Sequence, residues 1–194
     1  YDVYFVTEDN QAVPNTLATP VKLIVITAST PVVTIHDIQY TTDASGDSPY
    51  LGQTVTTSGI VTAIKNGTSG TQQAYTIQSG TGEWNAVYVY SSTPAVSVGD
   101  NVTITATVKE YYKMTEMDPV LSVTVVSQGN TVPAATELTT LAVNNESYEA
   151  VLVKVKRATC NNANASTGTF VVNDGTGDVT IFKSLYSALS LTVN

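Results

Sequence analysis

The stretch that decides the fold is YTIQSGTGEWNAVYVY, residues 75–90. It reads as a strand, a Gly-Thr-Gly turn and a second strand, because β-forming residues flank glycines that permit a tight turn. A weaker copy, FVVNDGTGDVTIF, occupies residues 170–182. The turn glycines Gly80 and Gly175 are 95 residues apart. An offset of this kind predicts a tandem repeat with one such hairpin in each copy.

The composition is that of an acidic β protein with few charges. The 194 residues carry a formal net charge of −8 and only 8 Lys and Arg, whereas nucleic-acid binders show a basic stripe that contacts phosphates. The densest basic cluster is Lys154, Lys156 and Arg157, so the acidity disfavours nucleic acid as a partner. Only 12% of residues are charged, while Thr, Ser, Val, Asn and Gly are abundant. We therefore expect an extracellular or cell-surface protein.

The ends of the sequence carry no targeting or membrane signal. Neither a signal peptide nor an apolar run long enough to span a membrane is present. The sequence begins at Tyr1 inside a strand-like pattern, which indicates a processed or excised chain.

Residues 31–130 are predicted to form a complete β-barrel of five strands. After the short lead-in Thr34–Gln39, a long strand is expected from Val55 to Lys65, with Gly59 as a bend or bulge that lets it serve both ends of a barrel. The hairpin 74–90 follows, and then strands at 102–108 and 120–126. Little room is left for helix.

Two segments of this barrel carry a family resemblance. LGQTVTTSGIVT (residues 51–62) and VGDNVTITATV (residues 98–108) resemble OB-fold accessory modules of secreted bacterial, extracellular nuclease-type multidomain proteins. The resemblance covers residues 34–128 and part of the second copy. It implies an OB-like fold and an accessory module rather than the enzyme, because the chain contains no catalytic nuclease motif.

The second copy, residues 131–194, is predicted to be an incomplete barrel. Its long first strand is expected at Tyr148–Lys156, followed by the hairpin 170–182. The 95-residue offset places Val193 and Asn194 on Val98 and Gly99, where the fourth strand of the first copy is about to begin. The second barrel therefore lacks its last two strands. The predicted fold is all-β, with two tandem five-stranded OB-like barrels, the second incomplete, and an N-terminal hairpin.

That hairpin, residues 1–30, could supply the missing strands. At a shift of 99, residues 20–27 align with residues 119–126, and residues 2–6 fall on residues 101–105. Pairing within one chain would be a circular permutation, whereas pairing between chains would be strand complementation that gives a head-to-tail homopolymer, a filament. The residues expected at this contact are Val3, Phe5, Leu23, Val25, Leu191 and Val193. Equally, the hairpin resembles the last strands of an immunoglobulin-like module, which would make the chain a fragment of a longer protein.

Candidate chemistry is sparse, and we predict a non-enzymatic protein without cofactor or metal. His36 is the only histidine, no nucleophile elbow is present, and a zinc site is improbable with one His and one Cys. Cys160 is expected to be buried, with an intermolecular bridge as the alternative. Asp174 and Asp178 could offer oxygens to calcium, but a tight hairpin turn is the preferred interpretation.

Aromatic side chains are the more informative candidates. Tyr75, Trp84, Tyr88, Tyr90, Tyr111 and Tyr112 are predicted to line an outer face. On OB-folds such a face stacks single-stranded nucleic acid or a glycan, but packing against a neighbouring domain or subunit is the interpretation we favour. Asn66 and Asn164 are glycosylation candidates, because both begin an Asn-x-Ser/Thr sequon in a predicted loop.

Overall fold

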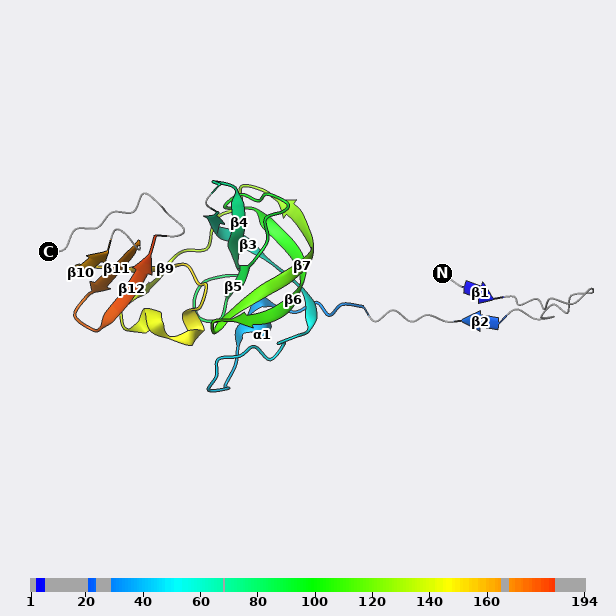
Figure 1. Ribbon diagram of the computed structural model, residues 1–194, viewed down its shortest axis with the longest axis horizontal. Coiled ribbons are helices and arrows are strands. Elements are labelled where there is room, and N and C mark those ends of the chain that lie inside the picture. Colours follow the sequence, from blue (N-terminus) through cyan, green and yellow to red (C-terminus); the bar gives the residue numbers. More distant parts are fainter. Residues whose placement is uncertain (1–2, 6–20, 24–28, 68, 165–167, 184–194) are drawn as a thin grey trace, which may run out of the picture.

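The computed structural model describes residues 3–5, 21–23, 29–67, 69–164 and 168–183 (Figure 1). Throughout these ranges the chain consists of β-strands joined by loops, the short α-helix α1 (Ile35–Gln39) and two 3-10 turns. The expected all-β class is therefore confirmed.

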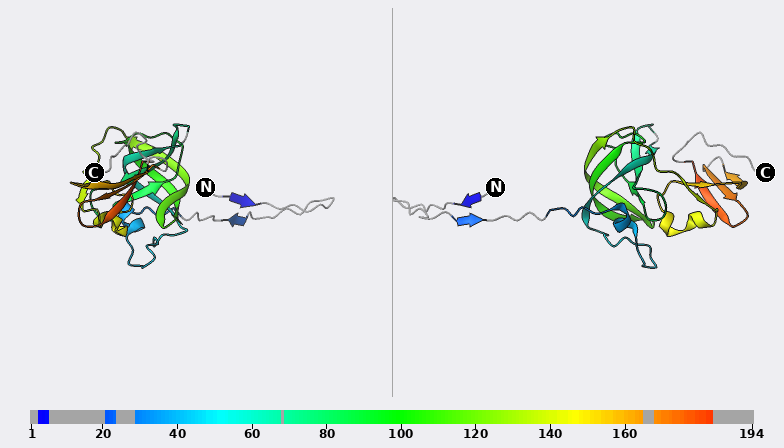
Figure 2. Two further views of the ribbon diagram at one scale, coloured as in Figure 1. Left: turned by 60° about the vertical axis from the view of Figure 1, so that its left-hand side comes forward. Right: turned by 180° about the vertical axis from the view of Figure 1, so that it is seen from behind.

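Five strands close into a barrel, seen from two further sides in Figure 2. They are β3 (Thr54–Asn66), β4 (Gln72–Gln78), β5 (Ala86–Val89), β6 (Asn101–Tyr111) and β7 (Met114–Ser127). Their order around the ring is β3-β4-β5-β7-β6, and neighbours are antiparallel except β5 and β7. The strands lie where the alternation predicts them, but β7 begins earlier than Val120. Tyr112 and Lys113 adopt positive φ of 51° and 65°, and this tight turn lets β6 and β7 pair almost from end to end.

The long strand β3 serves two neighbours, as its central glycine predicts. Its first half pairs with β6 from Thr54 to Ile60, and its second half pairs with β4 from Ile60 to Asn66. Gly59 lies at the changeover. A Cβ there would be 2.9 Å from Ile35 Cδ1 and 3.2 Å from the backbone of Gln78. Glycine is therefore needed because other chain segments approach this backbone closely.

The helix α1 packs against β3 and β5 and buries Ile35 and Ile38 completely in the barrel core. The short lead-in expected at residues 34–39 is thus a helix, which the sequence analysis did not predict. The helix forms because Thr34 and Asp37 make a capping box: Asp37 N donates to Thr34 Oγ1 at 3.0 Å, and Thr34 N donates to Asp37 Oδ2 at 3.0 Å. Both bonds satisfy amides at the helix start.

The second half of the chain is an open sheet in the described residues. β10 (Thr159–Asn164), β11 (Thr169–Asn173) and β12 (Asp178–Phe182) form it in that order, while β8 (Thr136–Leu138) pairs in parallel with β9 (Val153–Val155). The predicted hairpin 170–182 is confirmed as β11 and β12.

The predicted continuous strand Tyr148–Lys156 is wrong. Ala142–Asn144 and Glu146–Tyr148 are 3-10 turns, and only Val153–Val155 is a strand in this stretch. The physical reason is local: the Asn145 side chain accepts a hydrogen bond from Ser147 N, and Ala150 has a positive φ of 56°. Both features interrupt an extended backbone.

The two halves nevertheless share a local plan. In the barrel, Val33 N donates to Thr56 O and Thr56 N donates to Pro31 O, so an extended segment runs parallel to the first strand. The parallel pair β8–β9 repeats this arrangement. The order β10-β11-β12 likewise repeats β3-β4-β5.

A side-chain amide marks the equivalent point in each half. Gln39 Nε2 donates to the carbonyl of Ala86, the first residue of β5, at 2.6 Å. Asn144 Nδ2 donates to the carbonyl of Asp178, the first residue of β12, at 3.1 Å. In each half, the amide therefore ties the last residue of a helical turn to the first residue of a strand.

Hydrogen bonds join the barrel to the second half across the turn of the β4–β5 hairpin. Trp84 N donates to Ser147 O at 2.7 Å, and Leu152 N donates to the buried Gln78 side chain at 2.9 Å. The stretch 75–90 therefore connects the two halves as well as building the barrel.

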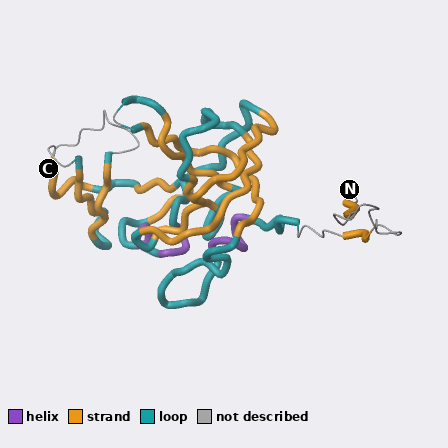
Figure 3. Tube along the Cα trace, turned by 45° about the vertical axis from the view of Figure 1, so that its right-hand side comes forward, coloured by secondary structure: helices purple, strands orange, loops and turns teal. Residues whose placement is uncertain are grey.

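The N-terminal hairpin is present as β1 (Val3–Phe5) and β2 (Val21–Leu23), which pair antiparallel. Figures 1 and 3 show this ribbon away from the barrel. Residues 6–20 and 24–28 lie outside the described ranges.

Candidate functional site

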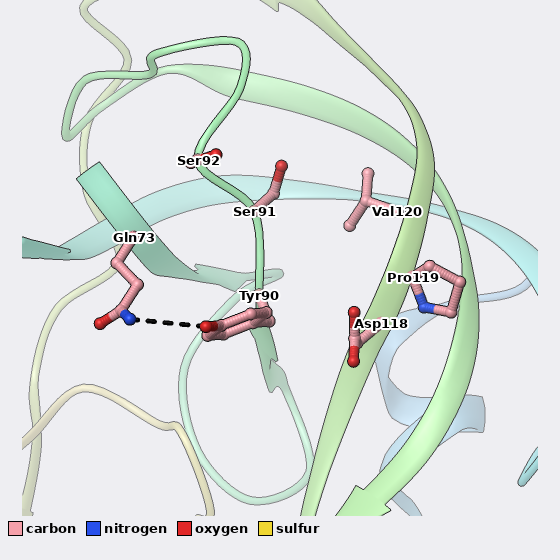
Figure 4. A pocket seen from close by; sticks show the side chains of 7 residues that line it. All are labelled: Gln73, Tyr90, Ser91, Ser92, Asp118, Pro119 and Val120. Atoms are coloured by element: carbon pink, nitrogen blue, oxygen red, sulfur yellow. Dashed lines mark hydrogen bonds between the residues drawn. The ribbon is translucent and has the colours of Figure 1, made fainter. Parts of the chain in front are cut away.

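A groove opens on the outer surface of the barrel where β5 ends. It encloses about 310 Å³ and is lined by Gln73, Tyr90, Ser91, Ser92, Asp118, Pro119 and Val120 (Figure 4). Figure 4 shows the Tyr90 ring spanning the space between the Gln73 and Asp118 side chains. The Gln73 amide donates to the Tyr90 hydroxyl at 3.4 Å. An aromatic ring with amide and carboxylate groups around it can both stack on a ligand and orient it.

An adjoining groove of about 370 Å³ extends this surface across β6. It shares Gln73, Tyr90 and Asp118 with the first and adds Lys65, Lys109, Tyr111 and Glu116. Lys109 Nζ lies 2.8 Å from Asp118 Oδ2, 3.6 Å from Glu116 Oε1 and 5.2 Å from the Tyr111 ring centroid. We call the two together the β5–β7 groove.

The charges of this groove offset one another. The hydrogen bond to Asp118 raises the pKa of Lys109, which keeps its ammonium protonated. Burial raises the pKa of Glu116, and the nearby Lys109 opposes that rise. Burial also raises the pKa of Tyr88 to about 12, with the Glu116 charge adding to it. Lys109 is committed to two carboxylates, and the charge of Lys65 is offset by Asp118 and Glu116 in the same lining, so this groove offers little attraction to phosphate.

The structure separates the predicted aromatic residues. Tyr90 and Tyr111 line the β5–β7 groove, and Tyr112 lies edge-on to Tyr111 with ring centroids 4.6 Å apart. Tyr88 is half-buried beside Glu116, its partner across the β5–β7 pair. The predicted alternation along this strand is confirmed: Val87 and Val89 point into the barrel, whereas Tyr88 and Tyr90 point outward.

The prediction that Tyr75 lies on the outer face is wrong. It is fully buried, because it pairs with Val89, whose side chain points into the barrel, and directly paired residues share a face of the sheet. Its hydroxyl has no hydrogen-bond partner among the described residues, and burial raises its pKa to about 12.

Trp84 belongs to a different part of the barrel. It packs edge-on against Tyr40 with centroids 5.8 Å apart, and Tyr40 stacks on His36 at 5.4 Å. His36 is an exposed residue of α1. The sequence gives no signal for this contact, because α1 was not predicted.

The open sheet is the second candidate site. One small apolar cluster, formed by Cys160, Phe170, Val172 and Val179, lies on it, and Phe182 is 63% exposed at its end. Cys160 is buried with a free thiol, as expected. In the ranges that the structure describes, no strand pairs with the outer edge of β10 or β12.

The residues predicted for assembly are only partly described. Val3 pairs with Leu23, and Phe5 pairs with Val21, in the backbone of the N-terminal hairpin. Val25, Leu191 and Val193 lie outside the described residues.

The glycosylation candidates lie at strand ends rather than in loops. Asn66 is the last residue of β3 and is exposed, and Asn164 is the last residue of β10. β3 runs one residue past its predicted end at Lys65, whereas β10 is a strand that the sequence analysis did not predict.

The Asp174 turn is structural. Gly175 has a φ of 101° between β11 and β12. Asp174 Oδ1 accepts from the hydroxyls of Thr140 and Thr176, each at 2.7 Å, and these bonds lower its pKa to about 2. This supports the tight-turn interpretation. Among the described residues, no group of three or more His, Cys, Asp or Glu is arranged to hold a metal ion.

A cluster of carboxylates at the junction of the two halves was not apparent from the sequence. Glu149 accepts from Thr115 N at 2.8 Å, and the neighbouring Glu110 accepts from Thr115 Oγ1 at 2.7 Å. Burial, followed by the Glu146 charge, raises the pKa of Glu149 to about 8. Glu110 is far from Glu146 and Glu149 in the chain, so only the fold brings the three together.

Within the described ranges, no helix has the length and apolar character needed to cross a membrane. Comparison with known proteins found no matching family model, no matching curated protein and no matching solved structure.

Proposed function

We propose that this is a non-enzymatic structural protein of the extracellular space or cell surface. It assembles head-to-tail by strand complementation, with the hairpin of residues 1–30 completing the open sheet of a neighbour. The observation that carries the proposal is the likeness of β10-β11-β12 to β3-β4-β5, without counterparts of β6 and β7 among the described residues.

In the barrel, β6 and β7 cover the two edges of the three-stranded unit β3-β4-β5. β6 pairs antiparallel with β3, and β7 pairs parallel with β5. Exposed edges present unpaired N–H and C=O groups, which form a template for strands from another chain. Phe182, at the end of β12 and 63% exposed, gives an incoming hairpin an apolar side chain to bury.

The N-terminal hairpin has the connectivity that this gap requires. β1 and β2 are antiparallel neighbours, as β6 and β7 are in the barrel. Donor and acceptor lie at opposite ends of the chain, so the contact between chains is heterologous. A heterologous contact that does not close into a ring propagates into a filament.

The test is a matched pair of charge substitutions in β1. Tyr4 pairs with Lys22, whereas Phe5 pairs with Val21, so the two positions belong to opposite alternate sets of the hairpin. Phe5→Asp should abolish polymers in size-exclusion chromatography and electron microscopy, while Tyr4→Asp should retain them. Deleting residues 1–30 should also abolish polymers and leave the barrel folded. Wild-type protein that remains monomeric, or unchanged polymer length after the deletion, would contradict the proposal.

A second candidate function is ligand binding by an OB-like barrel, favoured by the β5–β7 groove. The strand order, with β5 parallel to β7, supports the OB-like assignment. Tyr90 and Tyr111 offer stacking surfaces, and Gln73 and Asp118 offer hydrogen-bonding groups. Because Lys109 is paired with Asp118 and Glu116, we propose a glycan rather than single-stranded nucleic acid.

This candidate is tested by a glycan array and a parallel titration with single-stranded DNA. Tyr90→Ala should weaken glycan binding by about tenfold, a cost within the range measured for stacking on an aromatic side chain. Tyr112→Ala is the matched control, since Tyr112 is 89% exposed and does not line the groove. Equal binding by both variants, or a signal with DNA alone, would refute it.

A further inference from the structure

A third groove lies beside α1, on the loop that leads from the helix to β3. It encloses about 530 Å³ and is lined by Tyr40, Thr41, Thr42, Asp43, Asp47, Ser48 and Pro49. Its volume falls within the range of small-molecule sites. It shares no lining residue with the β5–β7 groove. Neither proposed function makes use of it.

One wall of this groove is Tyr40, which is one of three aromatic rings in contact with one another; we call the three the Tyr40 strip. Tyr40 is 48% exposed. His36 stacks on it with an interplanar angle of 11°, and Trp84 meets it edge-on at 80°. Contacts on two sides restrict the Tyr40 ring, so a ligand would meet a surface that is already ordered.

The backbone at Trp84 is held in an unfavourable conformation that maintains this strip. Its φ is 63°, a left-handed value that is costly for a bulky aromatic residue. The hydrogen bond from Trp84 N to Ser147 O, at 2.7 Å, fixes it there. The second half of the chain thus helps to position an aromatic side chain of the first.

The other wall of the groove is polar, and hydrogen bonds within the loop hold it in place. Asp43 N donates to Thr41 Oγ1 at 3.0 Å, and Ser45 N donates to Asp43 Oδ1 at 2.9 Å. The bond from Ser45 lowers the pKa of Asp43, so its carboxylate is an ionised acceptor at neutral pH. No Lys or Arg is among the lining residues, which disfavours phosphates and acidic sugars.

We infer that this α1 groove binds a neutral saccharide. The C–H face of a pyranose ring stacks on the Tyr40 strip, because aromatic faces are electron-rich and aliphatic hydrogens are weakly positive. The sugar hydroxyls donate to the carboxylates of Asp43 and Asp47 and exchange hydrogen bonds with the threonine hydroxyls.

The test uses the only tryptophan of the chain as a local reporter. Cellohexaose and mannohexaose are titrated separately into the full chain while the Trp84 fluorescence is recorded. A saturable change is expected with at least one of them by about 1 mM, the weak end of specific affinities. Tyr40→Ala should weaken that binding by about tenfold. Asp43→Asn should weaken it severalfold, since the amide oxygen still accepts from Ser45 but the charge is lost. Tyr112→Ala should bind as the wild type does.

Each other result overturns the inference. No saturable change with either sugar rules out a neutral saccharide here, and so does a response only to a chitosan hexamer, which would indicate an ammonium ligand. Calorimetric binding that leaves Trp84 silent and is lost in Tyr90→Ala would place the sugar in the β5–β7 groove instead. That result would support the second candidate function while refuting this site.

Discussion

Replacing Glu149 by Gln should remove a dependence of stability on pH that the fold itself creates. Glu149 comes from the second half of the chain and meets groups from every element around it. Thr115 N donates to it, Glu110 and Glu146 repel its charge, and the Gln39 amide opposes that effect by hydrogen bonding. Lys113 and Asp47 act on the neighbouring Glu146. The site therefore favours a protonated carboxyl over a carboxylate.

The magnitude follows from linkage between protonation and folding. The pKa of Glu149 is raised from the ordinary 4.5 to about 8. At about 1.4 kcal/mol per tenfold change in proton affinity, this corresponds to at most about 5 kcal/mol. Partial solvent access lowers the value, and we expect a loss of about 2–3 kcal/mol. The folded state holds the proton more tightly than the unfolded state. The stabilisation is therefore complete below pH 4.5 and is lost as the pH rises through about 8.

The assay is urea denaturation of the full chain between pH 5 and 9, followed by Trp84 fluorescence. The wild type should lose unfolding free energy steadily across this range. Glu149→Gln should be flat above pH 6 and more stable than the wild type at pH 9, because the amide oxygen still accepts from Thr115. Glu137→Gln is the control, since Glu137 is half-exposed and paired with Lys156 at 2.6 Å. A flat wild-type profile, or a fall that persists in Glu149→Gln, would refute the reasoning.

Local sequence patterns predicted the barrel strands because each strand has one face in the core. The alternation of Val102, Ile104 and Ala106, all fully buried, is such a pattern. The bend at Gly59 was also readable, because a glycine inside a strand signals a close backbone approach.

The failures share a different cause. Tyr75 was grouped with the outward tyrosines, but the face of the sheet on which its side chain lies is set by its pairing with Val89 in another strand. The expected strand at residues 148–156 is broken by a cap at Asn145 and by positive φ at Ala150, and propensity does not encode either reliably. The grooves are lined by residues that are distant in the chain, such as Tyr90 and Asp118, and no periodicity in the sequence reports that proximity.

Two substitutions in the barrel core test how it is packed. Gly59→Ala should cost about 1–3 kcal/mol of unfolding free energy, because the new methyl group meets Ile35 at 2.9 Å and the Gln78 backbone at 3.2 Å. Gly67→Ala, whose nearest neighbour would be 3.8 Å away, should change little in the same urea titration. Tyr75→Phe should have the opposite effect and raise the unfolding free energy of the barrel by about 1 kcal/mol. Its buried hydroxyl has no partner in the described part of the chain, so folding strips water from that group and returns no hydrogen bond. Phenylalanine keeps the ring and removes this cost. Tyr111→Phe, at an exposed ring, should be neutral. A loss of more than about 1 kcal/mol in Tyr75→Phe would show that the hydroxyl is hydrogen-bonded in solution, and the argument from an unpaired group would then fail.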